Sequence, residues 1–142
     1  MYILITMTRA DLLPFLQKHR LGVQSTVSPS GDPQAAVVGI AVTPEMEIVF
    51  DTLDTTRKCR NLRADPKIAL VIGWDQEITV QLEGLADEPT GADRDRILDA
   101  YFAVYPECRD HLAWTGITHF RVRPTWIRYS NFNAPQQIIE FA

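Results

Sequence analysis

Alternating hydrophobic and polar positions predict that strands form most of this chain. In residues 78–88 the apolar Ile78, Val80 and Leu82 are separated by polar residues, which is the pattern of a strand with one buried face. The segment VQSTVSPSGDPQAAVVGIAV (23–42) predicts two strands joined by its PSGDP turn. Further strands are predicted at 47–52 (EIVFDT), at 67–74 (KIALVIGW, apolar on both faces), at 118–130 and at 136–141.

Three segments have helical rather than alternating spacing. Thr8 precedes an amphipathic segment at 9–20, with Leu12, Leu13 and Leu16 expected inside and Gly22 expected to end the helix. A short helix is predicted at 55–65, before Pro66. Thr90, with Asp93 three residues later, is expected to start a third helix that extends to Tyr105. One more helical turn is expected after Pro106.

These elements predict one domain that spans residues 1–142. Six or so strands, mostly connected by hairpins and with helices inserted between them, favour a small antiparallel β-barrel over a βαβ sheet. The fold class expected from the sequence is therefore mainly β, with helices at the periphery.

Composition and charge exclude several classes of function. The net charge of −4 argues against a nucleic-acid surface, which usually has an extended basic stripe. The apolar run at 35–42 is too short to span a membrane, and MYILITMTRAD has no basic region before its apolar stretch, so a cytoplasmic location is expected. The two cysteines and three histidines have no metal-ligand spacing, so no metal is expected.

The segment TTRKCRNLRADP (55–66) has an unusual distribution of charge. Four of the 14 Lys and Arg residues, Arg57, Lys58, Arg60 and Arg63, lie within seven positions, and two of them fall in a first helical turn. Cations are mildly unfavourable there, because a helix N-terminus has a partial positive charge and unpaired N–H groups. A bound phosphate would explain this arrangement, with Thr55 or Thr56 as the helix cap. An ordinary solvated helix is the alternative.

The segment IVFDTLDTTRKCRNLRADPKIALVIGW (48–74), followed by a strand that ends in LEGLADE, resembles the central motif of a known family. This is the family of pyridoxamine 5'-phosphate oxidase-like flavoproteins, the FMN-binding split barrels. In these proteins a strand leads to a loop with Ser or Thr before Arg-Lys, and a helix then extends to Asn-Pro or Asp-Pro. The resemblance extends from about residue 8 to residue 132 and implies a six-stranded antiparallel split barrel.

The resemblance also implies a set of cofactor contacts. Arg57 and Lys58 match the phosphate-binding pair of the family, and Thr56 matches its small hydroxyl residue. The flavin would lie along the strand end at Asp51 and Thr52 and beside the backbone of the strand that contains Val37 and Val38. Thr79 occupies the place of a flavin-contacting Gln. The family forms homodimers with FMN between the subunits, so Trp126 or Tyr129 would cover the flavin, unless these two aromatic residues are core residues.

The chain departs from the oxidase pattern at three points. Ala36 stands where the oxidase has an Arg that helps to hold the phosphate. The segment QQIIEFA lacks the Arg and His that grip the oxidase substrate, and Asp51 replaces an aromatic residue. These departures predict a member of the oxidase-related and general-stress branch rather than a true pyridoxamine phosphate oxidase.

Three functions remain open at the level of the sequence. The first is an FMN-dependent oxidoreductase that acts on an unknown small molecule, in which the cofactor supplies the reactive group. The second is a reductase that uses a deazaflavin coenzyme, whose polyanionic tail would suit Arg60 and Arg63. The third is a flavin- or haem-binding stress protein without enzymatic activity, because a fold does not fix a function.

Overall fold

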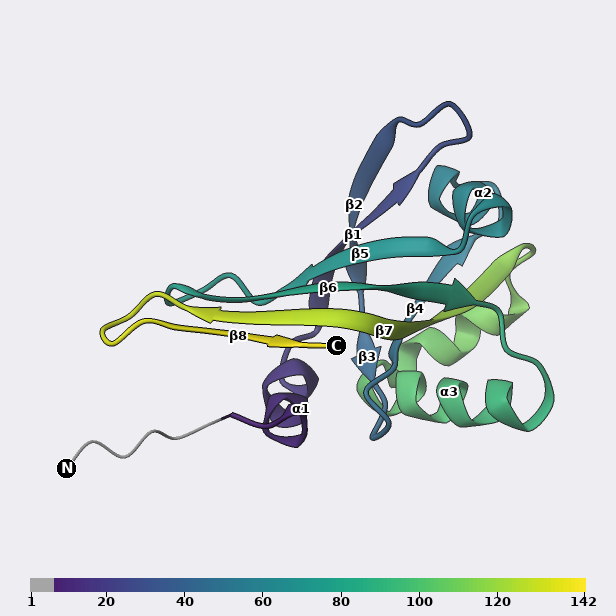
Figure 1. Cartoon of the computed structure of the whole chain (residues 1–142). Coiled ribbons are helices and arrows are strands. Elements are labelled where there is room, and N and C mark those ends of the chain that lie inside the picture. Colours follow the sequence, from purple (N-terminus) through teal and green to yellow (C-terminus); the bar gives the residue numbers. More distant parts are fainter. Residues whose placement is uncertain (1–6) are drawn as a thin grey trace.

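The computed structural model describes residues 7–142 and contains one antiparallel β-sheet with helices on its outside (Figure 1). The strands are β1 (Leu21–Val27), β2 (Pro33–Gly39), β3 (Ala41–Val42), β4 (Ile48–Leu53), β5 (Lys67–Ile72), β6 (Ile78–Asp87), β7 (Ile117–Asn131) and β8 (Gln137–Phe141). The helices are α1 (Arg9–Gln17), α2 (Arg57–Ala64), α3 (Gly91–Val104) and the 3₁₀ helix η1 (Pro106–Ala113). There are eight strands rather than six, partly because the segment expected as a single strand up to Val42 divides at Ile40.

The order of the strands shows how the sheet closes into a barrel. The strands lie in the order β2-β1-β5-β6-β7-β4-β3, and β8 pairs with β7. The first and last strands of this order, β2 and β3, are separated in sequence by Ile40 alone. One bent segment of chain therefore belongs to both ends of the sheet, so the sheet curls around a common interior. The expected class, an antiparallel split barrel with peripheral helices, is confirmed.

The barrel interior is the main hydrophobic core, and α1 contributes to it from outside the sheet. Phe50 and Phe120 pack at the centre with their ring centroids 5.7 Å apart. Leu12 and Leu16 of α1 are completely buried in the same core. Thr8 and Asp11 form a reciprocal capping box at the start of α1, as the capped helix pattern predicts. The helix ends at Gln17, so Gly22 does not stop it and lies inside β1 instead.

A second, smaller core lies on the opposite face of β4, beneath α3. Val49 points away from the barrel interior and packs against residues of α3, among them Ile97, Tyr101 and Phe102. Thr90 stands at the start of α3 but makes no side-chain cap there. The Asp93 carboxylate instead accepts a hydrogen bond from Arg96 and forms an ion pair with Arg121. These contacts replace the expected capping arrangement.

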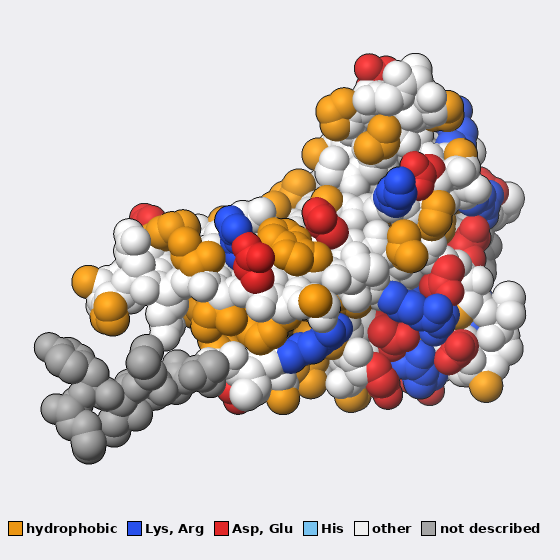
Figure 2. All heavy atoms as spheres, viewed as in Figure 1, with side chains coloured by type: hydrophobic (Ala, Val, Ile, Leu, Met, Phe, Trp, Pro, Cys, Tyr) orange, Lys and Arg blue, Asp and Glu red, His pale blue; other side chains and the backbone are white. Residues whose placement is uncertain are grey.

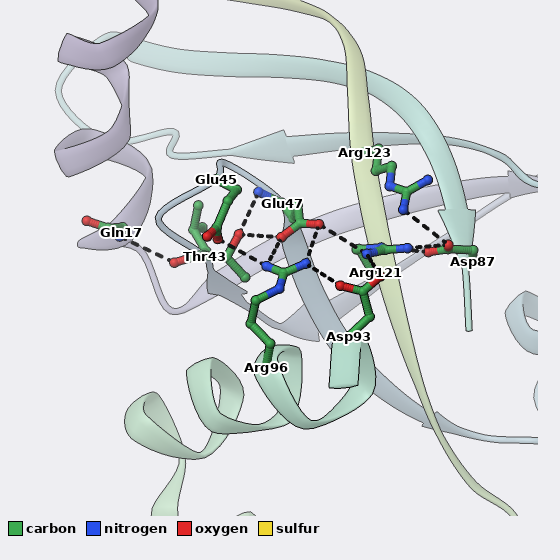
Figure 3. A network of polar contacts seen from close by, with 10 residues as sticks. Gln17, Thr43, Glu45, Glu47, Asp87, Asp93, Arg96, Arg121 and Arg123 are labelled. Carbon is green, nitrogen blue, oxygen red and sulfur yellow. Dashed lines mark hydrogen bonds and ion pairs between the residues drawn. The ribbon is translucent and has the colours of Figure 1, made fainter. Parts of the chain in front are cut away.

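A network of charged side chains joins α3 to the sheet (Figure 3). The Arg121 guanidinium lies among three carboxylates, with oxygens of Asp87, Glu47 and Asp93 at 2.6, 3.3 and 3.4 Å. Arg96 donates to Glu47 from the other side. This hydrogen bond from Arg96 is the largest cause that holds the pKa of Glu47 below its usual value, against the opposing effect of burial. In Figure 2, blue and red side chains gather over this part of the surface.

The outer face of β1, β2, β5 and β6 is exposed and largely apolar. The strand pairing places Val37, Val23 and Val71 side by side on this face, and Leu85 lies on it opposite Lys67. In β5 only Ile68, Leu70 and Ile72 face the core. This strand was expected to be apolar on both faces, and only one of the two faces is buried. Figure 2 shows hydrophobic side chains spread over the hairpin of β1 and β2 and over β5 to β8. Within residues 7–142, no helix has the length and apolar character needed to cross a membrane.

Candidate functional site

The candidate site begins where β4 leads into α2. Thr56 is the N-cap of α2, and its hydroxyl oxygen accepts a hydrogen bond from the backbone N–H of Cys59 at 3.3 Å. The same hydroxyl donates to the Leu53 carbonyl at 2.9 Å and lies 2.8 Å from the hydroxyl of Thr52. The backbone N–H groups of Arg57 and Lys58 precede the first intrahelical hydrogen bond and remain available to a ligand. Of the two caps considered from the sequence, Thr56 is the one that forms.

The four cations of this segment have different environments. Arg63 donates two hydrogen bonds to the Glu88 carboxylate, at 2.9 and 3.0 Å. Arg60 donates to the Thr55 carbonyl at 2.6 Å. The side chains of Arg57 and Lys58 take part in no hydrogen bond or ion pair with the described residues. The structure therefore leaves two of the four cations available at the start of α2.

Arg57 and Lys58 line an open pocket of about 220 Å³ between α2 and the hairpin of β1 and β2. The pocket has eight lining residues and none is acidic: Gln24, Thr26, Gln34, Ala35, Ala36, Thr56, Arg57 and Lys58. Ala36 is part of the wall, so the position at which the resemblance implies an additional Arg in the oxidase lies at this pocket. A site with two cations, free N–H groups and no carboxylate suits an anion such as a phosphate monoester.

Asn61 holds α2 against the pocket wall. Its buried side-chain amide donates to the hydroxyl of Thr26 at 3.0 Å and to the side-chain carbonyl of Gln34 at 2.9 Å. These bonds connect one helix to both strands of the hairpin. The positions of Arg57 and Lys58 relative to β1 and β2 are fixed by this polar contact as well as by the packing of Leu62 and Cys59.

Gln24 is a pocket residue that the sequence analysis missed. It is only 1% exposed, and its Oε1 atom is buried without a hydrogen-bond donor among the described residues. A buried carbonyl oxygen without a donor is costly, because it has lost its water and gained no partner. The sequence did contain a sign of this residue. Gln24 and Thr26 are polar residues at alternate positions of the strand VQSTV, and both side chains lie on the buried face of β1.

Asp51 and Thr52 lie on opposite faces of β4. Thr52 faces the side of Thr56 and is buried there. Asp51 faces α3 and η1, where its carboxylate lies 3.4 Å from Nδ1 of His111. Burial, with the Asp51 charge second, raises the pKa of the neighbouring Tyr101. Asp51 therefore does not line the α2 pocket. Thr52 does not line the pocket either, but its hydroxyl contacts Thr56, which does.

The remaining residues implied by the resemblance are divided between the core and the outer face. Val38 and Tyr129 belong to the barrel core, 7% and 6% exposed, and Tyr129 packs against Phe15. Val37 is 61% exposed on the outer face. Trp126 and Thr79 lie on that face too, and Trp126 borders a hollow of about 230 Å³. The structure thus brings Thr56, Arg57 and Lys58 together in one pocket and places the other residues elsewhere.

Among the described residues there is neither a cluster of metal-ligating side chains nor a thiol with a lowered pKa. No group of three or more His, Cys, Asp or Glu residues is placed to hold a metal ion in the described part of the chain. Burial raises the pKa of both thiols, Cys59 and Cys108, so they remain protonated and weakly nucleophilic at neutral pH. Burial also lowers the pKa of His119, which is neutral at pH 7.

Comparison with known proteins identifies relatives of this chain. A sequence model described as pyridoxamine 5'-phosphate oxidase matches residues 9–131. A pyridoxine/pyridoxamine 5'-phosphate oxidase of Rubrobacter xylanophilus is 36% identical over 95 residues, which are 66% of this chain and 42% of the relative. The corresponding enzyme of Azorhizobium caulinodans is 35% identical over 93 residues, 65% of this chain and 42% of the relative. The chain thus spans about two fifths of the length of these relatives.

Solved structures share the fold at low sequence identity. A haem-binding protein from Mycobacterium smegmatis superposes with a TM-score of 0.80 at 18% identity, over 95% of this chain and 59% of the other. A pyridoxamine 5'-phosphate oxidase-related, FMN-binding protein from Nostoc punctiforme has a TM-score of 0.64 at 13% identity, over 87% and 86% of the two chains. General Stress Protein 26 from Bacillus anthracis has a TM-score of 0.65 at 15% identity, over 95% and 100%. At these identities the similarity shows the fold alone.

Proposed function

Since the chain belongs to the pyridoxamine 5'-phosphate oxidase family, we propose that it is an FMN-dependent oxidoreductase that acts on a small molecule. The proposal assigns residues 1–142 to one FMN-binding domain. The observation that supports it is the pocket at the start of α2, which has no acidic lining residue and where the side chains of Arg57 and Lys58 have no hydrogen-bond or ion-pair partner among the described residues. The pocket fits the cofactor in a second respect, because Gln24 Oε1 has no donor among the described residues and is able to accept a hydrogen bond from a ligand.

The residues of this pocket would hold the cofactor by its phosphate. Arg57 and Lys58 would neutralise the phosphate charge, and the Thr56 hydroxyl and the free N–H groups of α2 would donate to its oxygens. Bound FMN supplies the chemistry, the exchange of hydride or electrons with a substrate, and the protein binds and orients it. This division of roles agrees with the lack of a metal cluster or an activated thiol among residues 7–142.

The structure favours FMN over a deazaflavin coenzyme as the first ligand to test. The deazaflavin hypothesis relies on Arg60 and Arg63 to bind a polyanionic tail. Both side chains already have partners, the Thr55 carbonyl and the Glu88 carboxylate. A single phosphate needs only Arg57 and Lys58.

Absorption spectroscopy of the purified protein and titration with FMN test the proposal. We expect saturable binding, with a flavin band that bleaches on chemical reduction and returns under anaerobic conditions when an oxidised small-molecule substrate is added. Absence of FMN binding would overturn the proposal. Binding without reoxidation by any small molecule would favour a protein that only holds the cofactor.

We further propose that two copies of the chain associate through the apolar outer face. Val71 lies in the middle of this face on β5, between Val23 and Gln81, and Val37 and Trp126 lie on the same face. An apolar sheet face of this kind is a common site of association with a second copy. A small barrel also encloses a flavin poorly by itself, and a second copy would supply the missing wall.

Replacing Val71 by Glu should convert the dimer into a monomer, because two copies would bury unpaired carboxylates against each other. The molar mass from analytical ultracentrifugation measures this directly. Leu112→Glu is the matched control, since Leu112 is similarly exposed but lies on η1. A wild-type monomer, or a Val71→Glu variant that remains dimeric, would contradict the assignment of this face.

A further inference from the structure

We infer that Gln24 recognises the polyol chain of the cofactor, which makes the pocket selective for a polyol phosphate over a free phosphate. The inference rests on the proposed binding of FMN and adds to it a residue and a chemical selectivity. Gln24 lies on β1 opposite Ala36 of β2 and Leu70 of β5, and it lines the same pocket as Arg57 and Lys58.

The first step concerns which groups around Gln24 already have partners. Thr26, the next inward residue of β1, accepts a hydrogen bond from Asn61. Gln34, the cross-strand partner of Thr26, accepts from the same Asn61 amide. The side-chain NH2 group of Asn61 thus donates to these two acceptors and makes no hydrogen bond with Gln24. The Oε1 atom of Gln24 remains buried without a donor among the described residues.

The second step concerns the chemistry that would satisfy Gln24. A carbonyl oxygen accepts hydrogen bonds and donates none, so it needs an O–H or N–H group from the ligand. A phosphate dianion, the form that dominates above about pH 8, is a poor donor, and its negative oxygens would be repelled by the carbonyl dipole. The ribityl chain of FMN has hydroxyl groups next to the phosphate, and a hydroxyl is a donor. The site therefore combines two cations for the phosphate with one buried neutral acceptor, Gln24 Oε1, which a neighbouring hydroxyl would reach when the Gln24 side chain turns toward the pocket.

The third step concerns Ala36, which stands opposite Gln24 in the pairing of β1 with β2. An Arg side chain would bring another cation and more donors to this wall, directly across from the Gln24 carbonyl. With Ala36 at this position, the wall formed by β1 and β2 is neutral. Specificity on this side of the pocket then depends on hydrogen bonding to a neutral ligand group rather than on charge.

The variant Gln24→Met tests this role, because it keeps the length of the side chain and removes its polar atoms. The melting temperature of the free protein should stay the same or rise by about 2–6 °C, since an unsatisfied buried carbonyl is removed. A structural role for Gln24 would have the opposite effect. FMN affinity should fall about tenfold, because the ligand hydroxyl loses its acceptor.

Calorimetric titrations with three ligands at about pH 8.5, where free phosphate is mainly the dianion, separate the possible outcomes. Gln24→Met should weaken the binding of FMN and of ribitol 5-phosphate but not that of inorganic phosphate, whereas Lys58→Ala should weaken all three. If Gln24→Met loses as much affinity for inorganic phosphate as for the other two ligands, or loses affinity for none of them, the inference is overturned while the proposed FMN binding stands. If the wild-type protein does not bind FMN but binds ribitol 5-phosphate through Gln24, the proposed function fails and the role of Gln24 stands.

A measurement on the wild-type protein covers the case in which Gln24→Met does not fold. The side-chain amide signal of Gln24 in a ¹⁵N NMR spectrum should shift when ribitol 5-phosphate is added and remain in place when inorganic phosphate is added. A signal that responds equally to both ligands, or to neither, would contradict the inference.

Discussion

Lys58→Ala should weaken FMN binding by about 10- to 100-fold without lowering the melting temperature of the free protein. A hydrogen bond to a charged group contributes about 1.5–3 kcal/mol, which corresponds to this range of dissociation constants. Because the Lys58 side chain has no hydrogen-bond or ion-pair partner among the described residues, its truncation breaks no described contact of this kind in the free protein. Fluorescence quenching of FMN during titration measures the affinity, and a melting curve checks the fold.

Arg60→Ala is the matched control, since it removes the same charge from the same helix. The Arg60 guanidinium donates to the Thr55 carbonyl and is not part of the pocket wall. It therefore contributes only to the long-range field, which salt screens. The double variant Arg57→Ala, Lys58→Ala should bind FMN more weakly than either single variant. Equal losses in Lys58→Ala and Arg60→Ala would show that net charge, rather than contact, determines the affinity.

Much of the fold could be predicted from local patterns in the sequence. The alternation from Ile78 to Leu82 and the PSGDP turn reflect short-range chemistry, and both elements are present in the structure. The closure of the barrel could not be predicted, because it depends on the bend at Ile40 that places β2 and β3 at opposite ends of one sheet. No local pattern of residues specifies that long-range arrangement.

The candidate site was predictable only where its residues are adjacent in the sequence. Thr56, Arg57 and Lys58 form one motif and line one pocket. The second wall comes from a hairpin about 30 residues earlier, so Gln24 had no visible relation to that motif. The sequence also did not show that Arg60 and Arg63 have partners, because Glu88 lies 25 positions from Arg63. Such pairing is a property of the tertiary structure.

The second large effect concerns stability. Arg121→Ala should reduce the free energy of unfolding by about 3 kcal/mol at pH 7. The Arg121 side chain is only 4% exposed, and its removal leaves Glu47, which is 10% exposed, with one cation fewer in a largely buried network. Breaking a buried ion pair typically costs 3–5 kcal/mol. We expect a loss at the lower end of this range of free energies, because the side chains of Asp87 and Asp93 are about half exposed and can be solvated by water. Urea denaturation followed by circular dichroism measures the change.

The same network predicts how stability depends on pH. The pKa of Glu47 is lower in the folded protein than its ordinary value of 4.5, so the carboxylate stabilises the fold fully above that value. Stability should therefore fall as the pH decreases from about 5 through the folded pKa of Glu47. Glu47→Gln should be less stable than the wild type at pH 7 and should lose less of its stability on acidification. Parallel pH profiles for the two proteins would exclude Glu47 as the group that titrates, and the acid sensitivity would then belong to other carboxylates.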